Sequence, residues 1–183
     1  MDAINNILNR VSARELSTPY PNEDEMKIVY KGALRAPDHA WLRPSSFIEV
    51  KEDGLKKLSK IFHEYALSVS DISKEVIEKY KNAPYRAPMI LILVNTCKEH
   101  PKVPFIEQKL STATAAQNIM LALNAMSYSC IWRTGKLAFN EIIQKKLGLK
   151  QNQEILGYLY IGTEVGKKKK IPELDTGNFV EYL

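Results

Sequence analysis

The stretch "MILILVNT", residues 89–96, decides the fold class. Its first six residues are all apolar, so a strand formed here must be covered on both faces. The apolar run is too short for a membrane-spanning helix, which needs about 20 apolar residues. Helical patterns occur on both sides of it along the chain. The stretch therefore predicts a central strand of a sheet that lies between helical layers.

Two further segments read as strands, "SFIEV" at 46–50 and "EILGYLYIG" at 154–162. Helical spacing or capping signals surround them and predict helices at 2–11, 22–36, 55–65, 70–82, 106–127 and 139–149. Asp2 is a predicted N-cap, and Asn22 with Glu25 forms a predicted capping pair. The helix at 106–127 is apolar most of the way round, which indicates burial in the core or in a dimer interface.

These elements predict an α+β fold with a mixed central sheet flanked by helices, in a single domain over residues 1–183. No signal peptide or membrane helix is predicted, which favours a cytoplasmic protein. The two cysteines, Cys97 and Cys130, match no zinc or redox spacing. We expect both to be small buried side chains in a reducing compartment.

The charge pattern argues against a nucleic-acid-binding protein. The net charge is +5. The single run Lys167–Lys170 supplies four positive charges, so the excess of positive charge is concentrated there. Such a run predicts a solvated segment rather than a basic face. The sequence has no GxGxxG, GxxxxGK[ST], GxSxG or HExxH motif. With no metal site or side-chain nucleophile predicted, a bound organic cofactor is the better enzyme hypothesis.

Three clusters have the chemistry to hold an anionic, planar ligand. The first is "NRVSAR", where Arg10 and Arg14 are spaced i, i+4 around Ser12. Two guanidinium forks and a hydroxyl suit a phosphate monoester. The alternative is a helix C-terminus whose arginines complement the helix dipole.

The second cluster is "RAPDHAW", in which Arg35 and His39 are also spaced i, i+4, with Pro37 between them. The alternative is an ordinary helix C-cap, with Trp41 in the core. The third is "CIWRTG", where Trp132 offers an aromatic wall and Arg133 a cation. Thr134 and Gly135 follow, and their backbone can approach a ligand closely. A turn with one core tryptophan is the alternative here.

These clusters, in this order, resemble the nitroreductase family of FMN flavoproteins, in particular its small NAD(P)H nitroreductases. The likeness covers nearly the whole chain. It is carried by Arg10–Arg14, "LRAPDHAWLRPSSFIEV" at 34–50, "APYRAPMILILV" at 83–94, the helix at 107–126, "IWRTG" at 131–135 and "LGYLYIGT" at 156–163.

The resemblance implies an intertwined homodimer with FMN at the subunit interface and NADH or NADPH as co-substrate. It implies ten cofactor-binding residues: Arg10, Val11, Ser12, Arg14, Arg35, His39, Trp132, Arg133, Thr134 and Gly135. The first four would lie at the FMN phosphate and ribityl end. The next two would reach the flavin from the other subunit. The last four would flank the ring, with backbone N–H groups near N5. The segment 122–127 resembles a nicotinamide-nucleotide contact.

The implied activity is transfer of hydride from NAD(P)H to FMN and then to a nitroaromatic, quinone or similar acceptor, in a ping-pong cycle. No side chain is expected to act as a catalytic residue. Two departures from the family pattern affect the site. Val11 replaces a second arginine, and Ser45 replaces a tryptophan that many relatives carry, which predicts a wider pocket. A reductive dehalogenase, a flavin-modifying enzyme and a basic binding module without cofactor are the alternative functions.

Overall fold

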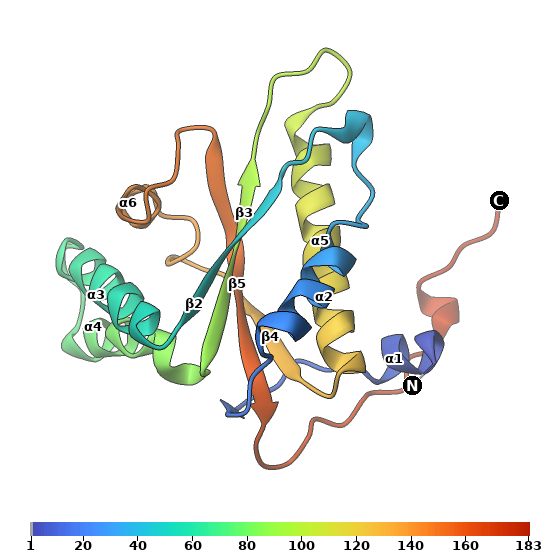
Figure 1. The fold of residues 1–183 in the computed structure, drawn as a ribbon, viewed down its shortest axis with the longest axis horizontal. Coiled ribbons are helices and arrows are strands. Elements are labelled where there is room, and N and C mark those ends of the chain that lie inside the picture. The colour runs from blue at the N-terminus through green and yellow to red at the C-terminus, as the bar shows by residue number, and fades with distance from the viewer. Residues whose placement is uncertain (1) are drawn as a thin grey trace.

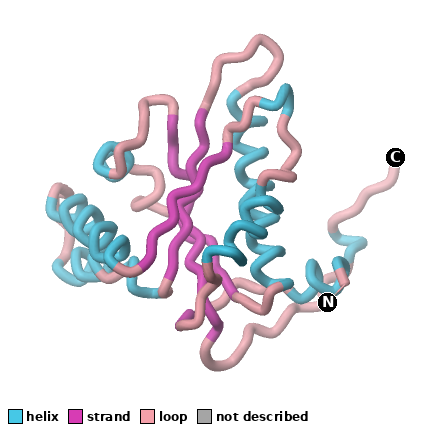
Figure 2. Tube along the Cα trace, viewed as in Figure 1, coloured by secondary structure: helices cyan, strands magenta, loops and turns pink. Residues whose placement is uncertain are grey.

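The computed structural model describes residues 2–183 as a five-stranded sheet between two groups of helices (Figure 1). The strands are paired in the order β1–β5–β3–β2, and β4 also pairs with β5. Figure 2 shows them crossing the middle of the molecule. Their bounds are β1 Leu16–Ser17, β2 Ser45–Lys51, β3 Met89–Thr96, β4 Ser129–Arg133 and β5 Gln153–Glu164.

The three predicted strands are confirmed as β2, β3 and β5, but β1 and β4 were not predicted. The residues of β4, "SCIWR", carry no clear alternation and follow directly on a long helix, so they read as a turn. Every strand pairing is antiparallel. The parallel component expected of a mixed sheet is limited to one isolated bridge between Ser12 and Cys130.

The helices agree closely with the predicted segments. They are α1 Ala3–Asn9, α2 Glu23–Ala33, α3 Asp53–Leu67, α4 Lys74–Lys81, α5 Phe105–Ala125 and α6 Glu141–Lys146, with 3-10 turns η1 His39–Trp41, η2 Ala83–Arg86 and η3 Thr176–Asn178. Both predicted N-terminal caps are confirmed. Asp2 accepts from the backbone of Ile4 and Asn5, and Asn22 forms a reciprocal capping box with Glu25.

β3 separates two apolar cores, as its sequence predicted. Leu91 and Leu93 pack on one face, in a cluster that includes Ile119 of α5. Ile90 and Ile92 pack on the other, in a cluster that includes residues of α3 and α6. Figure 1 shows α2 and α5 on one side of the sheet and α3, α4 and α6 on the other. All eight residues of β3 except Thr96 are buried.

Gly157 of β5 leaves room for the indole ring of Trp132, which belongs to the neighbouring strand β4. Its φ is +149°, and a Cβ atom at this position would lie 2.1 Å from Nε1 of Trp132. The indole N–H of Trp132 donates to the carbonyl of Leu156, 3.3 Å away. A side chain larger than hydrogen would therefore displace the indole.

Apolar surface remains exposed at α1 and along the C-terminal segment. The apolar stripe of α1 does not face the core, because Ile4 and Leu8 are each more than 60% exposed while Asn6 is buried. Phe179 and Tyr182, near the C-terminus, are also exposed. No helix in residues 2–183 is long and apolar enough to cross a membrane.

Candidate functional site

Two of the three predicted clusters lie side by side at β4. The backbone N–H of Ala13 donates to the carbonyl of Cys130 at 3.1 Å, and Ser12 forms a bridge with the same residue. The segment 10–14 therefore runs alongside β4, which also pairs with β5. This pairing brings the Arg-Ser-Arg cluster next to the strand that ends in Trp132 and Arg133.

Each of these two clusters contains a buried guanidinium nitrogen that lacks a hydrogen-bond partner within residues 2–183. These atoms are Nη1 of Arg10 and Nε of Arg133. The Arg133 guanidinium lies 5.6 Å from the ring centre of Tyr160, which provides a cation–π contact. Oε1 of Glu164 is also buried without a partner. Burying an unsatisfied donor costs about 1–3 kcal/mol, and more when it is charged, so the two arginines favour an acceptor from outside the chain.

A cavity of about 390 Å³ opens at the end of β4. Trp132, Arg133 and Thr134 of the third cluster line it. Four cations and no carboxylate lie on its wall, and tyrosines from α4 and β5 complete it. The cations are Lys79, Arg86, Arg133 and Lys136, and the tyrosines are Tyr80, Tyr158 and Tyr160.

Two tyrosines of this cavity, Tyr158 and Tyr160, are neutral polar groups. Burial strongly raises the pKa of the Tyr158 phenol, which donates to the carbonyl of Leu137 at 2.7 Å. Burial also raises the pKa of Tyr160, although Arg86 and Arg133 partly oppose this. The lining therefore offers positive charge and neutral hydrogen bonds, without a side chain placed as general base.

A second cationic cavity, of about 400 Å³, is lined by Arg14 and Lys167–Lys170. The sequence predicted that this lysine run would be solvated. Although its side chains are largely exposed, the run gathers with Arg14 instead of lying apart from the site. The backbone N–H of Val165 donates to the carbonyl of Glu15 at 3.1 Å, which ties the start of this segment to the residues after Arg14.

The remaining predicted residues, Arg35 and His39, do not join the two clusters within one chain. Both are exposed. Nδ1 of His39 lies 2.7 Å from the carboxylate of Glu107, in the first turn of α5, whereas β4 follows the other end of that helix. A 21-residue helix is about 30 Å long. His39 therefore lies at the end of α5 opposite to β4.

The loop after α2 also corrects one expectation. Trp41 is not a core residue, since it is 77% exposed, with the Arg43 guanidinium 5.3 Å from its ring centre. Ser45 borders a cavity of about 30 Å³, and its hydroxyl lies 3.0 Å from that of Thr112. The wider flavin pocket expected at Ser45 stays a prediction.

Several lining residues were missed by the sequence analysis. Lys79 and Arg86 come from α4 and η2, and Lys136 from the loop after β4, so no motif connects them. Their only common signal is charge at the ends of short elements. Such charges are usually solvated, and only the fold brings these three together.

Comparison with known proteins agrees with this geometry. The Nitroreductase family model matches residues 7–163. The Escherichia coli (strain K12) protein named "Putative NAD(P)H nitroreductase YdjA" is 32% identical over 184 residues, with all of both chains covered. A nitroreductase-like family protein from Bacillus cereus superposes with a TM-score of 0.84 at 21% identity, over 100% of this chain and 96% of that one. A nitroreductase with bound FMN from Bacteroides fragilis superposes with a TM-score of 0.76 at 18% identity, over 100% of both chains. The chain belongs to the nitroreductase family of oxidoreductases.

Proposed function

We propose that this chain is an FMN-dependent NAD(P)H oxidoreductase. The observation that carries the proposal is the pair of unpartnered buried guanidinium nitrogens, on Arg10 and Arg133, together with two cavities that have cationic walls, one lined by Arg133 and the other by Arg14. FMN has a dianionic phosphate at one end and a ring that gains negative charge on reduction at the other. The donor set therefore fits both ends of the cofactor.

Residues around the cavity lined by Arg14 would hold the phosphate end. Arg10, Ser12 and Arg14 would donate to the phosphate and ribityl oxygens, and the backbone at Val11 would lie between them. The lysines at 167–170 share a cavity with Arg14, so one or more of them would add positive charge there. Charge-assisted hydrogen bonds of this kind are about twice as strong as neutral ones.

Residues at the end of β4 would hold the ring end. Trp132 would flank the isoalloxazine, and Arg133 would place positive charge beside it. Gly135, at φ +91° and with no atom near its missing side chain, would let the backbone N–H groups after Thr134 approach the ring. FMN, when bound, would accept hydride from NADH or NADPH and pass the electrons to a nitroaromatic, quinone or similar acceptor, in a ping-pong cycle.

The proposal includes a homodimer, in which Arg35 and His39 reach the flavin of the partner subunit. Exposed apolar side chains on α1, on α5 and near the C-terminus support association. They include Ile4, Ile7, Leu8, Ile106, Leu110, Phe179 and Tyr182. Large exposed apolar patches on soluble proteins mark interaction surfaces.

The test is spectroscopic. The purified chain, saturated with FMN and then desalted, should keep a flavin absorbance near one FMN per chain. The flavin should bleach when NADPH or NADH is added without oxygen and recover when a quinone is added. Light scattering should give the mass of a dimer. A colourless chain that takes up no FMN would overturn the proposal and favour a binding module.

A further inference from the structure

A cavity of about 650 Å³ lies away from the cationic site, at the start of β5. Its walls come from the loop after β3, the first residue of α5, the loop and helix around α6, and the first residues of β5. Cavities of 300–1,000 Å³ are typical of small-molecule sites. None of its lining residues lines either cationic cavity.

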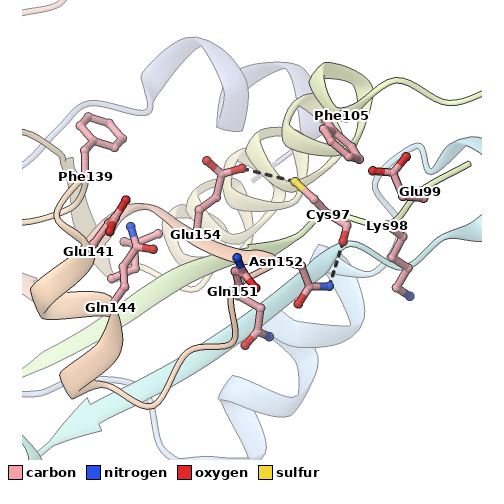
Figure 3. A pocket seen from close by; sticks show the side chains of 12 residues that line it. Cys97, Lys98, Glu99, Phe105, Phe139, Glu141, Gln144, Gln151, Asn152 and Glu154 are labelled. Atoms are coloured by element: carbon pink, nitrogen blue, oxygen red, sulfur yellow. Dashed lines mark hydrogen bonds between the residues drawn. The ribbon is translucent and has the colours of Figure 1, made fainter.

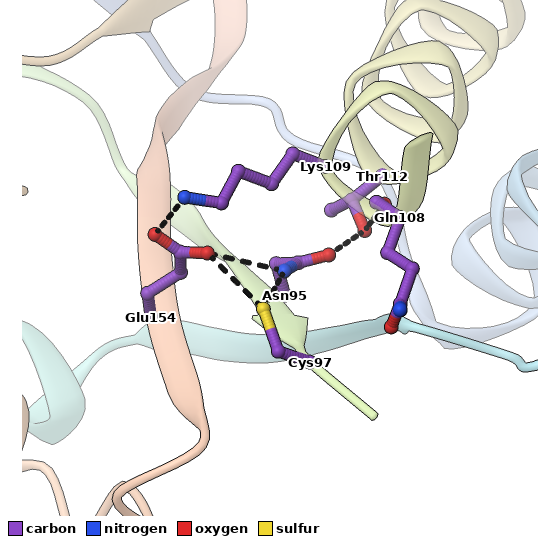
Figure 4. A network of polar contacts seen from close by, with 6 residues as sticks. All are labelled: Asn95, Cys97, Gln108, Lys109, Thr112 and Glu154. Carbon is purple, nitrogen blue, oxygen red and sulfur yellow. Dashed lines mark hydrogen bonds and ion pairs between the residues drawn. The ribbon is translucent and has the colours of Figure 1, made fainter. Parts of the chain in front are cut away.

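The floor of this cavity is held rigidly by a polar network (Figure 4). The carboxylate of Glu154 accepts from the side-chain amide of Asn95 at 3.2 Å and pairs with Lys109 at 3.0 Å. Asn95 is fully buried, and its carbonyl oxygen accepts from Thr112 at 3.0 Å. The Asn152 amide donates to the backbone carbonyl of Cys97 at 2.9 Å. The floor is thus preorganised before any ligand binds.

Hydrogen-bond acceptors dominate the lining. Three carboxylates lie on it, from Glu99, Glu141 and Glu154. The one ammonium among the lining residues, that of Lys98, donates to the backbone carbonyl of Leu42. Two further lysines lie outside the lining and pair with carboxylates: Lys109 with Glu154, and Lys145 with Glu141 at 3.8 Å. Glu154 also accepts from Sγ of Cys97 at 3.5 Å. Each carboxylate has about four acceptor sites, so one remains on Glu154 and most remain free on Glu99 and Glu141.

The side-chain amides of Gln144 and Gln151 also line the cavity, and neither makes a hydrogen bond within the described chain. Two aromatic rings flank the acceptors. Phe105 is 44% exposed and Phe139 is 65% exposed. Figure 3 shows them on either side of Glu154. Exposed rings beside one fixed carboxylate, that of Glu154, and two exposed ones suit a ligand with a flat apolar body and N–H donors at its edge.

We propose that this cavity binds a small aromatic molecule that carries amino or amidinium groups. The ring would lie against Phe105 and Phe139, and its N–H groups would donate to Glu154, Glu141 and the free glutamines. Anions are excluded by the carboxylates, so neither FMN nor a nucleotide phosphate fits here. The inference uses none of the residues assigned to the phosphate and ring ends of the flavin.

The experiment is a titration of the full chain with three matched probes, followed by NMR and calorimetry with and without excess FMN. The probes are benzamidine, neutral benzamide and anionic benzoate. Benzamidine should bind at least roughly fivefold more tightly than benzamide, and benzoate should not bind. Phe139→Ala and Glu141→Gln should each weaken benzamidine binding roughly three- to tenfold. Both side chains are exposed, so folding should be unaffected.

Glu173→Gln is the control, since this exposed carboxylate lies near the C-terminus, outside the cavity. It should leave benzamidine affinity unchanged. The proposal is overturned if benzoate binds as well as benzamidine, if no probe binds, or if Phe139→Ala and Glu141→Gln both bind like the wild type. Displacement of benzamidine by FMN would show that benzamidine binds at the cationic site, and this result would also overturn the proposal.

Discussion

The two regions along β5 differ in the sign of the charge that they present. At the start of the strand, Glu154 belongs to a cavity of acceptors whose buried polar atoms are paired with one another. Further along, Tyr158 and Tyr160 face a cavity of cations, and two buried guanidinium nitrogens nearby have no partner among residues 2–183. The buried polar atoms of the first region are satisfied by the chain itself, whereas the two guanidinium nitrogens of the second need an acceptor from outside.

This difference separates a polar network that is complete within the chain from a candidate ligand site. A polar network that is internally complete contributes to stability and shapes a surface. A set of buried donors without acceptors is expensive to fold, so its presence indicates that an acceptor is supplied from outside. The four predictions below test whether stability and ligand binding separate between the two regions in this way.

The largest effect is expected at Gly157, where the two regions meet. Gly157→Ala would place a methyl group 2.1 Å from the Trp132 indole, at a φ that other residues rarely adopt. We expect unfolding in urea to be easier by about 3 kcal/mol or more. Gly32→Ala is the control, because Gly32 lies in α2 with open space beside it. That change should be neutral or stabilising by up to about 1 kcal/mol. Equal effects from both changes would refute the packing argument.

The next effect is expected at the acceptor-lined end. Asn95→Ala would remove a fully buried amide that contacts Thr112, Glu154 and Cys97. The loss should be about 2–3 kcal/mol in urea unfolding, because buried partners lose their hydrogen bonds. FMN affinity should stay unchanged, since the cationic cavities share no residue with this network. A large loss of FMN binding with intact folding would show that the two regions are not separate.

Local signals account for what could be predicted from the sequence. β3 was clear because six consecutive apolar residues need cover on both faces, and the caps at Asp2 and Asn22 depend on neighbours only two or three residues away. β4 was missed because its five residues gain their structure from pairing with β5, which begins 20 residues after β4 ends. Strand pairing of this kind depends on the whole fold rather than on local propensity.

The candidate site could be predicted only in parts, for the same reason. The clusters at 10–14 and 132–135 each carried a chemical signal, but their contact comes from one backbone hydrogen bond between Ala13 and Cys130. Arg86 carried no signal at all, because its position in the cavity depends on where η2 packs. The placement of Arg35 and His39 at a partner's flavin remains a prediction.

A smaller effect is expected at Arg10, on ligand affinity rather than on stability. Arg10→Ala should weaken FMN binding by about 1.5–3 kcal/mol, the scale of a charge-assisted hydrogen bond, and leave the fold nearly unchanged. Fluorescence titration measures the affinity. Lys60→Ala is a matched loss of positive charge on α3, where the side chain is 79% exposed, and should bind FMN like the wild type. Equal affinity in both variants would remove Arg10 from the phosphate site.

The smallest effect concerns the two thiols, one in each region, and depends on pH. Burial raises the pKa of Cys130 to about 12, although Arg10 lowers it somewhat. Burial and the nearby Glu154 carboxylate also raise the pKa of Cys97. A raised thiol pKa means that the folded chain holds a proton that the unfolded chain releases above about pH 9. The contribution of Cys130 to stability is therefore complete below about pH 9 and is lost as the pH rises toward 12.

At pH 10 the loss from Cys130 should be about 1.4 kcal/mol. Cys130→Ala should remove this part of the pH dependence, so the difference in unfolding free energy between variant and wild type should shrink from pH 8 to pH 10. Cys97→Ala should show a weaker change of the same sign, because Cys97 is only half-buried. If the difference for Cys130→Ala stays constant over this range, the thiol ionises in the folded chain as easily as in the unfolded one. The cationic residues near β4 would then act on Cys130 more strongly than its burial does.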